Sequence, residues 1–404
     1  MKALAAVVCL VLAARITVLQ GVTAGILLSL VLLPVWAVAL WRLRGGSSIL
    51  TFGVLAMISG IVLTDFFAGD HPTNDSMMQQ NTFSLISLIG GIGIIVWARS
   101  ILGSAGTALW YGLGLLAGAV THGLNMDNVW KFDLSVPATV TVLALCMLSR
   151  KLWLEVAALL LLAVVSALND SRSAGSMLLV AAALVVWQAL GSRLSKSSTT
   201  VRTLAVFGFV AVIGYASLQA FILEGWFGKA AAVRSEEQIA QSGSLILGGR
   251  PELGASTELI AANPFGLGSG TMANGIDLFI AKMGMARLNY DPNNGYVEKY
   301  MFGNGFEVHS MLGDLWIRYG IFGALLLVAL LVVVALGTAG QVAKRQASGL
   351  MIFLAIQVFW DSLFAPFFST SISTLVLGVG LAMVPRAKTA ASQAVRSDFV
   401  SFER

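Results

Sequence analysis

Most of this chain consists of apolar runs that are each long enough to cross a membrane as a helix. A transmembrane helix needs about 20 residues, and the runs lack the alternation of a transmembrane β-strand. The sequence therefore predicts an all-α integral membrane protein with about twelve transmembrane helices. The expected spans are 3–20, 22–41, 48–68, 82–101, 104–121, 136–149, 152–169, 174–191, 202–222, 311–336, 348–365 and 367–385.

Composition supports the same class. Hydrophobic residues make up 57% of the 404 residues and charged residues only 11%, whereas soluble domains carry roughly 25% charged residues. The net charge of +5 does not identify a partner, because the basic inner loops of a membrane protein would produce it. Cys9 and Cys146 both lie in apolar runs without a second cysteine or histidine nearby, so we expect them to be packing residues.

The first apolar run has two interpretations. Lys2 followed by the apolar stretch 3–14 resembles a signal peptide as much as a first helix. Arg15 interrupts the run, and a second apolar run begins a few residues later. We expect a short first helix that is retained, and cleavage remains the alternative.

Basic residues fall in every second connection between the expected spans, which predicts the orientation of the chain. Fifteen of the 25 basic residues lie on that side, and both termini are then cytoplasmic. The protein is therefore expected in the cytoplasmic (inner) membrane. The basic residues on the inner side are Lys2, Arg42, Arg44, Arg99, Arg150, Lys151, Arg193, Lys196, Arg202, Lys344, Arg345, Arg386, Lys388, Arg396 and Arg404.

The organisation of the chain follows from this topology. Nine spans in 1–222 precede a polar loop at 223–310, three spans follow in 311–385, and 386–404 is a polar cytoplasmic tail. A loop of this length is rarely a mere connection, so we expect it to be a partly helical functional loop on the periplasmic side.

Two helices are expected inside the loop. One ends at Asn263, because a residue that precedes proline avoids the helical conformation. In the other, Ile276, Phe279, Ile280 and Met283 recur at helical spacing and form an apolar face. That face could rest on the membrane surface or pack on the bundle, and the sequence does not separate these alternatives.

Three residues from separate parts of the chain are placed on the outer side. Arg172 lies among small residues, and Arg250 follows two glycines. Each arginine could be a membrane-interface anchor or a solvated loop residue, but together they offer two planar donor forks for a diphosphate. His309, just before the next span, could be an interfacial residue or a general base near neutral pH. We expect His71 and His122 to be solvated surface residues.

Two acidic features are weaker candidates. Asp314 and Arg318 are four residues apart, so they can pair along one helix face, and we favour a self-neutralising pair over a substrate role. Asp65, Asp70 and His71 could bind a divalent cation, but nothing in their spacing fixes a ligand geometry, so no metal site is expected.

The stretches NDSRSAG, GGRPELGASTELIAANPFGLGSG and EVHSMLGDLWIRYGIFGALL resemble, in this order, the bacterial O-antigen ligase and O-antigen polymerase superfamily. The resemblance covers mainly residues 165–335 and implies a GT-C-like bundle. It implies that Arg172 and Arg250 bind a lipid diphosphate and that His309 deprotonates the acceptor hydroxyl. Asp314 and Arg318 are our own candidates for supporting residues. Ser310 departs from the family, which often has Asn there.

The resemblance implies a metal-independent, inverting glycosyltransferase without a cofactor. Its partners would be an undecaprenyl-diphosphate-linked glycan donor, a glycan acceptor, the lipid bilayer and a chain-length regulator, and no nucleic acid is implied. We expect a polymerase of repeat units of O-antigen, capsule or exopolysaccharide. An O-antigen ligase acting on lipid A core, and a lipid-linked glycan flippase or transporter, are the alternatives.

Overall fold

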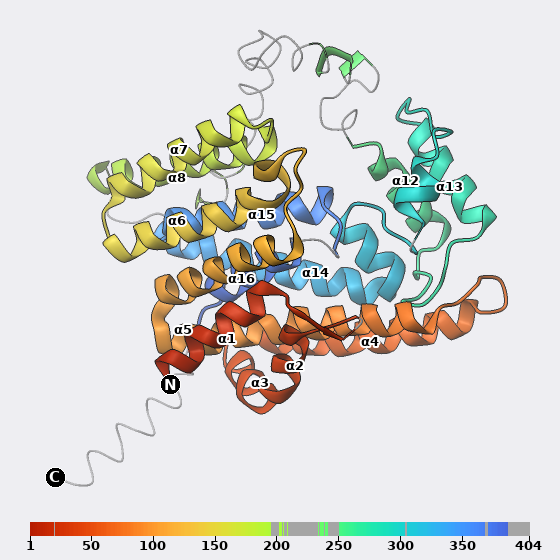
Figure 1. Ribbon diagram of the computed structural model, residues 1–404, viewed down its shortest axis with the longest axis horizontal. Helices are drawn as coiled ribbons and strands as arrows, with labels where there is room; N and C mark the ends of the chain where they lie inside the picture. Colours follow the sequence, from red (N-terminus) through yellow and green to blue (C-terminus); the bar gives the residue numbers. More distant parts are fainter. Residues whose placement is uncertain are drawn as a thin grey trace.

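The computed structural model describes residues 1–19, 21–194, 202–203, 205, 208, 233, 235–237, 239–240, 250–303, 305–367 and 371–386. Within these residues the chain is a bundle of helices with one short β-hairpin (Figure 1). The elements are α1 (Lys2–Ala14), β1 (Thr17–Leu19), β2 (Val22–Thr23), α2 (Ala24–Val31), α3 (Leu33–Trp41), α4 (Gly46–Phe67), α5 (Asp75–His122), η1 (Trp130–Leu134), α6 (Ser135–Ser149), α7 (Leu152–Leu168), α8 (Arg172–Leu194), α12 (Glu252–Ala262), α13 (Gly275–Ala286), η2 (Val297–Met301), α14 (Met311–Ala343), α15 (Gly349–Phe364) and α16 (Ser371–Ala382).

Several of these helices are long and apolar enough to cross a membrane, which confirms the prediction of an all-α membrane protein. By length and composition there are five such helices in the described part of the chain, or six if the bent pair α2 and α3 forms one span. Most of the expected span 202–222 and the tail after residue 386 lie outside the described residues.

Helix α5 contains two arms that run in opposite directions. Gly103 interrupts it with φ 73° and ψ 170°, a conformation that glycine adopts without strain. The Tyr111 hydroxyl donates to the Ser373 carbonyl at 3.1 Å, and the Arg99 guanidinium donates to the carbonyls of Gly380 and Leu381. Both arms therefore lie beside α16, and they match the separately expected segments 82–101 and 104–121.

Three expected spans differ from the structure. The run 3–20 is helical only to Ala14 and continues into the β1–β2 hairpin. The run 22–41 is two helices that meet at 73°, with Pro34 in the first turn of α3, where its missing N–H costs no helical hydrogen bond. The run 311–336 lies within α14, which is broken at Gly320 (φ 63°, ψ −155°). Apolar composition predicted these runs, but breaks inside them depend on local backbone geometry.

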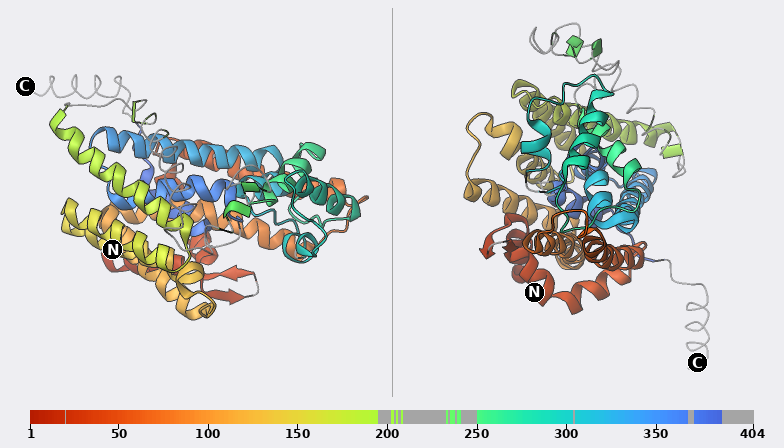
Figure 2. Two further views of the ribbon diagram at one scale, coloured as in Figure 1. Left: turned by 90° about the horizontal axis from the view of Figure 1, so that it is seen from above. Right: turned by 90° about the vertical axis from the view of Figure 1, so that its right-hand side faces the viewer.

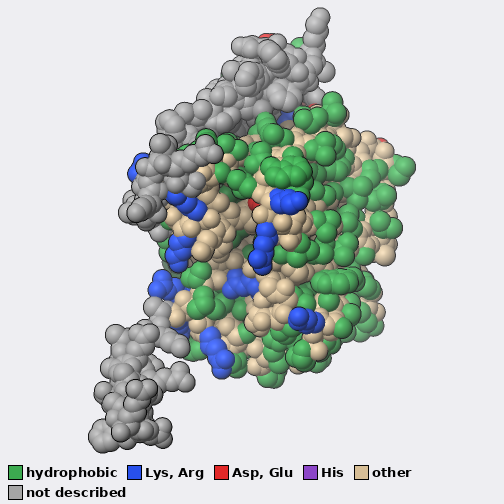
Figure 3. All heavy atoms as spheres, turned by 90° about the vertical axis from the view of Figure 1, so that its left-hand side faces the viewer, with side chains coloured by type: hydrophobic (Ala, Val, Ile, Leu, Met, Phe, Trp, Pro, Cys, Tyr) green, Lys and Arg blue, Asp and Glu red, His purple; other side chains and the backbone are tan. Residues whose placement is uncertain are grey.

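Basic side chains gather at one end of the bundle, the left-hand end in Figure 1. Arg99 donates three hydrogen bonds to the last turn of α16 and to Met383, and Arg386 donates to the Leu43 carbonyl and to Ser47. Figure 3 shows this face with its lysines and arginines. Helices α12 and α13 lie at the opposite end (Figures 1 and 2). The end that holds α12 and α13 is therefore separate from the basic end of the bundle.

Helices α12 and α13 pack on each other through a small core of their own. Gly254 and Gly284 allow the backbones to approach, since a Cβ on Gly254 would lie 2.1 Å from the Gly284 carbonyl oxygen. Helix α12 ends at Ala262, as the Asn263–Pro264 pair predicted. The apolar face of α13 does not pack on the bundle, because Ile276 is 69% exposed and Phe279 is 64% exposed.

The first helix and the cysteines belong to the main core. Helix α1 packs against the second arm of α5, and Ala5 and Cys9 are completely buried. Cys146 is half-buried, and both cysteines are free thiols. Their expected role as packing residues is confirmed for Cys9, which lies among Val8, Leu12 and their neighbours.

Candidate functional site

Arg250 lies directly before α12, at the end of the molecule opposite the basic end. Its side chain is half-buried, and its charge acts on Tyr296 and on Asp361. Tyr296 immediately precedes η2, and Asp361 belongs to the last turn of α15. Two elements that are distant in sequence therefore lie within electrostatic range of this guanidinium.

Glu252 and Tyr296 form a buried polar contact next to Arg250. The Tyr296 hydroxyl donates to Glu252 Oε1 at 2.7 Å. Burial and the negative charge of Glu252 raise the pKa of Tyr296, so this hydroxyl remains protonated and keeps donating. The other carboxylate oxygen, Glu252 Oε2, is buried and has no hydrogen-bond partner among the described residues. Such an atom is an acceptor that a bound hydroxyl or amide could satisfy.

His309 lies beside Tyr296, with the two ring centroids 6.1 Å apart. Its Nδ1 is 3.3 Å from the Glu307 carbonyl oxygen, which can only accept. In the neutral imidazole, a hydrogen on Nδ1 leaves Nε2 as an acceptor, which is the atom that a general base needs. The backbone of His309 has φ 53°, an uncommon value for a residue other than glycine. It directs the chain from the extended segment before it into α14.

Ser310 caps α14 directly after His309. Its Oγ accepts from the Gly313 amide at 3.3 Å and lies 3.4 Å from the Ser362 carbonyl oxygen on α15. Ser is among the preferred N-cap residues. This cap fixes the start of α14, and His309 is the residue immediately before the cap.

Asp314 and Arg318 are buried supports of the same segment. The two oxygens of Asp314 accept from the amides of Val308 and Phe367, each at 2.8 Å. Arg318 donates to the Phe306 carbonyl and, at 2.9 Å, to Asn81 Oδ1. Asp314 therefore binds the backbone at Val308, and Arg318 binds it at Phe306, on either side of residue 307. We favoured a self-neutralising pair of these two side chains; the contacts described are with backbone groups and Asn81, and direct pairing of Asp314 with Arg318 stays a prediction.

Arg172 is the first residue of α8, and its contacts are separate from those of Arg250. Its Nη1 donates to Ser235 Oγ at 3.2 Å, and its Nε is 3.7 Å from Asp170 Oδ1. Gln188, near the other end of α8, donates to the Ala347 carbonyl at 2.9 Å. Arg172 therefore lies toward the end of α15 that holds Asp361. Among the described residues, no contact joins it to Arg250 or His309.

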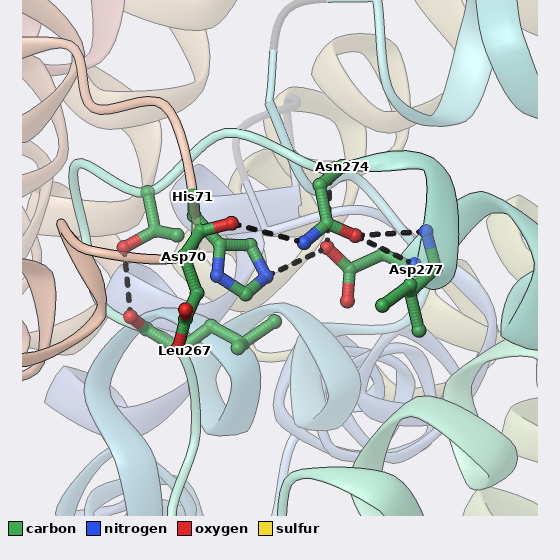
Figure 4. A network of polar contacts seen from close by, with 7 residues as sticks. Asp70, His71, Leu267, Asn274 and Asp277 are labelled. Carbon is green, nitrogen blue, oxygen red and sulfur yellow. Dashed lines mark hydrogen bonds and ion pairs between the residues drawn. The ribbon is translucent and has the colours of Figure 1, made fainter.

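His71 is not the solvated surface residue that we expected. Its side chain is 9% exposed, and its Nε2 is 3.0 Å from Asp277 Oδ2 (Figure 4). Asp277 also accepts from the Asn274 amide, and Asn274 caps α13 and donates to the Asp70 carbonyl. The loop between α4 and α5 is thereby joined to α13. His122 is exposed, as expected.

Across the described parts of the chain, no group of three His, Cys, Asp or Glu side chains is arranged to hold a metal ion. The acidic loop that contains Asp65 and Asp70 thus contributes a structural contact through His71, as described above.

The sequence did not single out Glu252, Tyr296 or Asp361. A signal existed for Asp361, because a carboxylate in an apolar run is a functional candidate by default. Its oxygens accept from Gln357 Nε2 at 2.7 Å and from Thr374 Oγ1 at 3.0 Å. Glu252 and Tyr296 had no such signal, because polar residues in a polar loop are ordinary.

These observations define a helical membrane protein with a cluster of ionisable side chains at one end. Comparisons of the chain with protein-family models, with curated proteins and with solved structures give no match. The side chains and their arrangement therefore carry the functional argument.

Proposed function

We propose that this protein is a membrane glycosyltransferase that polymerises undecaprenyl-diphosphate-linked oligosaccharide repeat units into a surface polysaccharide. The bundle would have about twelve spans in the cytoplasmic (inner) membrane, with the basic end and both termini in the cytoplasm. The cluster around Arg250 and His309 would then face the periplasm, where lipid-linked donors are presented.

The observation that carries this proposal is the arrangement around Tyr296. Its ring lies beside that of His309, and its hydroxyl donates to Glu252, which is two residues from Arg250 in the chain. A cation and an unprotonated imidazole are the two groups that transfer from a diphosphate requires, one for the leaving group and one for the nucleophile.

The reaction begins at the acceptor hydroxyl. His309 Nε2 takes its proton while the oxygen attacks the anomeric carbon of the donor sugar. The bond between that carbon and the diphosphate oxygen breaks, and its electron pair leaves with the lipid diphosphate. Attack opposite the leaving group inverts the anomeric configuration. The proton ends on His309, and no oxidant or cofactor is needed for the balance.

The leaving group is an anion, so fixed cations lower the barrier most when its charge develops. Arg250 is proposed to contact the diphosphate with its planar donor fork, and Arg172 is proposed to contribute from the start of α8. Glu252 is proposed to hold Tyr296 in place and to accept a sugar hydroxyl at Oε2. Partners beyond the two glycans, such as a chain-length regulator, remain part of the proposal.

An assay of the purified protein with a polyprenyl-diphosphate-linked oligosaccharide, run with EDTA, tests this function. We expect a ladder of longer lipid-linked glycans from the wild type and none from His309→Ala. His122→Ala is the matched control, since His122 is exposed and outside the cluster. It should retain the ladder.

The same assay separates the alternatives. Single transfer to an added lipid A core acceptor, without a ladder, would replace the polymerase with a ligase that uses the same residues. A donor that is not consumed under any condition would contradict transfer altogether. Specific uptake of lipid-linked glycan into liposomes would then identify a transporter.

A further inference from the structure

Three tyrosines and His309 form a cluster of aromatic rings, which we call the aromatic platform. Tyr296 is its central ring. Its centroid lies 5.6 Å from that of Tyr300, with the two rings stacked, 6.1 Å from that of His309 and 6.4 Å from that of Tyr290. One tyrosine ring therefore connects the candidate general base to two further aromatic side chains.

The backbone that carries these tyrosines is held in place. Asn294 Nδ2 donates to the Tyr290 hydroxyl at 2.8 Å, and Asn294 Oδ1 accepts from the Tyr296 amide at 3.0 Å. Val297 and Met301 of η2 are completely buried in the core that α12 and α13 share. A site on a fixed backbone loses little freedom when a ligand binds. The platform is therefore preformed.

Tyr300 presents its ring to solvent. It is 69% exposed, although Val297 and Met301 of the same short helix already anchor η2 in the core. A single exposed aromatic residue is ordinary, but this one is stacked on a ring that lies beside the candidate base. The faces of an aromatic ring are electron-rich, and the C–H groups on one face of a pyranose carry partial positive charge. A sugar ring therefore packs favourably on such a surface.

A carboxylate next to the platform supplies the polar contact that a sugar also needs. Glu252 is 9% exposed, and its Oε1 accepts from the Tyr296 hydroxyl. Its Oε2 is buried and has no hydrogen-bond partner among the described residues. A sugar hydroxyl can donate to that oxygen, whereas a lipid acyl chain has no donor to offer. An exposed ring together with an unsatisfied acceptor therefore fits a carbohydrate better than a lipid.

We infer that the aromatic platform binds a sugar ring of the acceptor glycan, an inference that rests on the proposed transfer by His309. The acceptor hydroxyl must reach His309 Nε2, so the rings that adjoin His309 belong to the acceptor side. Recognition at this site is through the sugar and needs neither the diphosphate nor the lipid. Tyr300 supplies the exposed face, and Glu252 Oε2 accepts one of the hydroxyls. Both residues bind the substrate, and neither transfers a proton.

Saturation-transfer NMR of the full-length protein in detergent tests the inference. The probe is the free oligosaccharide that mild acid releases from the lipid-linked donor of the transfer assay, so it carries no diphosphate. The wild type should bind it, and Tyr300→Ala should weaken binding roughly two- to tenfold, the range of an aromatic contact. Tyr300→Phe keeps the ring and should bind like the wild type. Glu252→Gln replaces the free acceptor with a donor and should weaken binding several-fold.

Phe279→Ala is the matched control, because Phe279 is a 64% exposed aromatic residue of α13 that does not belong to the platform. It should keep wild-type binding of the oligosaccharide. In the transfer assay, Tyr300→Ala should raise the KM for the lipid-linked glycan by a factor similar to its loss of binding, with a much smaller change in kcat. A general loss of folded protein would lower the rate without raising KM.

Three results would overturn the inference. They are no binding of the free oligosaccharide by the wild type at millimolar concentrations, unchanged binding by Tyr300→Ala, and equal losses in Tyr300→Phe and Tyr300→Ala, which would assign the effect to the hydroxyl.

The proposed function fails separately from this site. If Tyr300→Ala weakens oligosaccharide binding but the wild type consumes no donor, the sugar site stands and the glycosyltransferase does not. If the ladder forms but Tyr300→Ala binds the oligosaccharide normally, the polymerase stands and the sugar site does not.

Discussion

Two histidines at the same end of the molecule differ in what surrounds them. His71 is nearly buried, and its Nε2 is bound to a carboxylate that also caps a helix. His309 is half-buried, lies against a tyrosine ring, and makes one long contact through Nδ1 to a carbonyl. The first imidazole joins the loop before α5 to helix α13, and its Nδ1 is buried without a hydrogen-bond partner among the described residues. Each ring therefore leaves one nitrogen over, and the difference between the two is burial and the carboxylate partner of His71.

The largest expected effects come from replacing each of the two histidines with alanine. His309→Ala should reduce glycan transfer by roughly 10²–10⁴-fold, the usual contribution of a general base, with little change in stability. His71→Ala should keep most activity and lose about 1–3 kcal/mol of stability, because the Asp277 carboxylate stays buried without its partner. Transfer rates and thermal denaturation of both variants measure this. Equal losses of transfer activity in the two variants would contradict the different roles of His71 and His309.

The next effect concerns Arg250. Arg250→Lys keeps the charge but replaces the planar fork with a single ammonium group. If the loss is one charge-assisted hydrogen bond of roughly 1.5 kcal/mol or more, transfer should fall at least tenfold. Arg287→Lys changes an exposed arginine in the same way and should leave the rate unchanged. Wild-type rates for Arg250→Lys would show that Arg250 acts only as a point charge.

A smaller effect is expected at Tyr296, whose ring lies beside that of His309. Tyr296→Phe removes the hydrogen bond to Glu252 Oε1, and the buried carboxylate should then cost about 1–3 kcal/mol. Tyr300→Phe is the control, because Tyr300 stacks on Tyr296 but is 69% exposed. Thermal denaturation of the two variants should differ. If they melt alike, the contact with Glu252 adds nothing to stability.

The smallest effect comes from the ion pair between Lys282 of α13 and Glu298 of η2. Hydrogen bonding to Lys282 lowers the pKa of Glu298. A carboxyl with a depressed pKa stabilises the fold at neutral pH and loses that contribution as the pH falls through its folded pKa. The gain is about 0.2–1 kcal/mol, because the pair is solvent-exposed. Hydrogen exchange in α13 should be faster in Glu298→Gln at pH 7, and the difference should vanish in acid.

Sequence reasoning identified the fold class because long apolar runs admit few alternatives. It chose His309 and Arg250 because both lie in the one long polar loop; the structure places Tyr296 beside His309 and bonds it to Glu252, two residues from Arg250. It missed the environment of His71, because Asp277 is 206 residues away and such a pair has no local pattern. It likewise missed the bend near Leu32, where a continuous apolar run hides a change of direction.

The break at Gly320 divides α14 into a short arm before it and a long arm after it. The long arm packs against α4 and must follow the thickness of the bilayer, which helices accommodate by tilting. The short arm begins at the Ser310 cap and carries Asp314 and Arg318. The break at Gly320 therefore separates the first turns after His309 from the apolar arm that is long enough to cross a membrane.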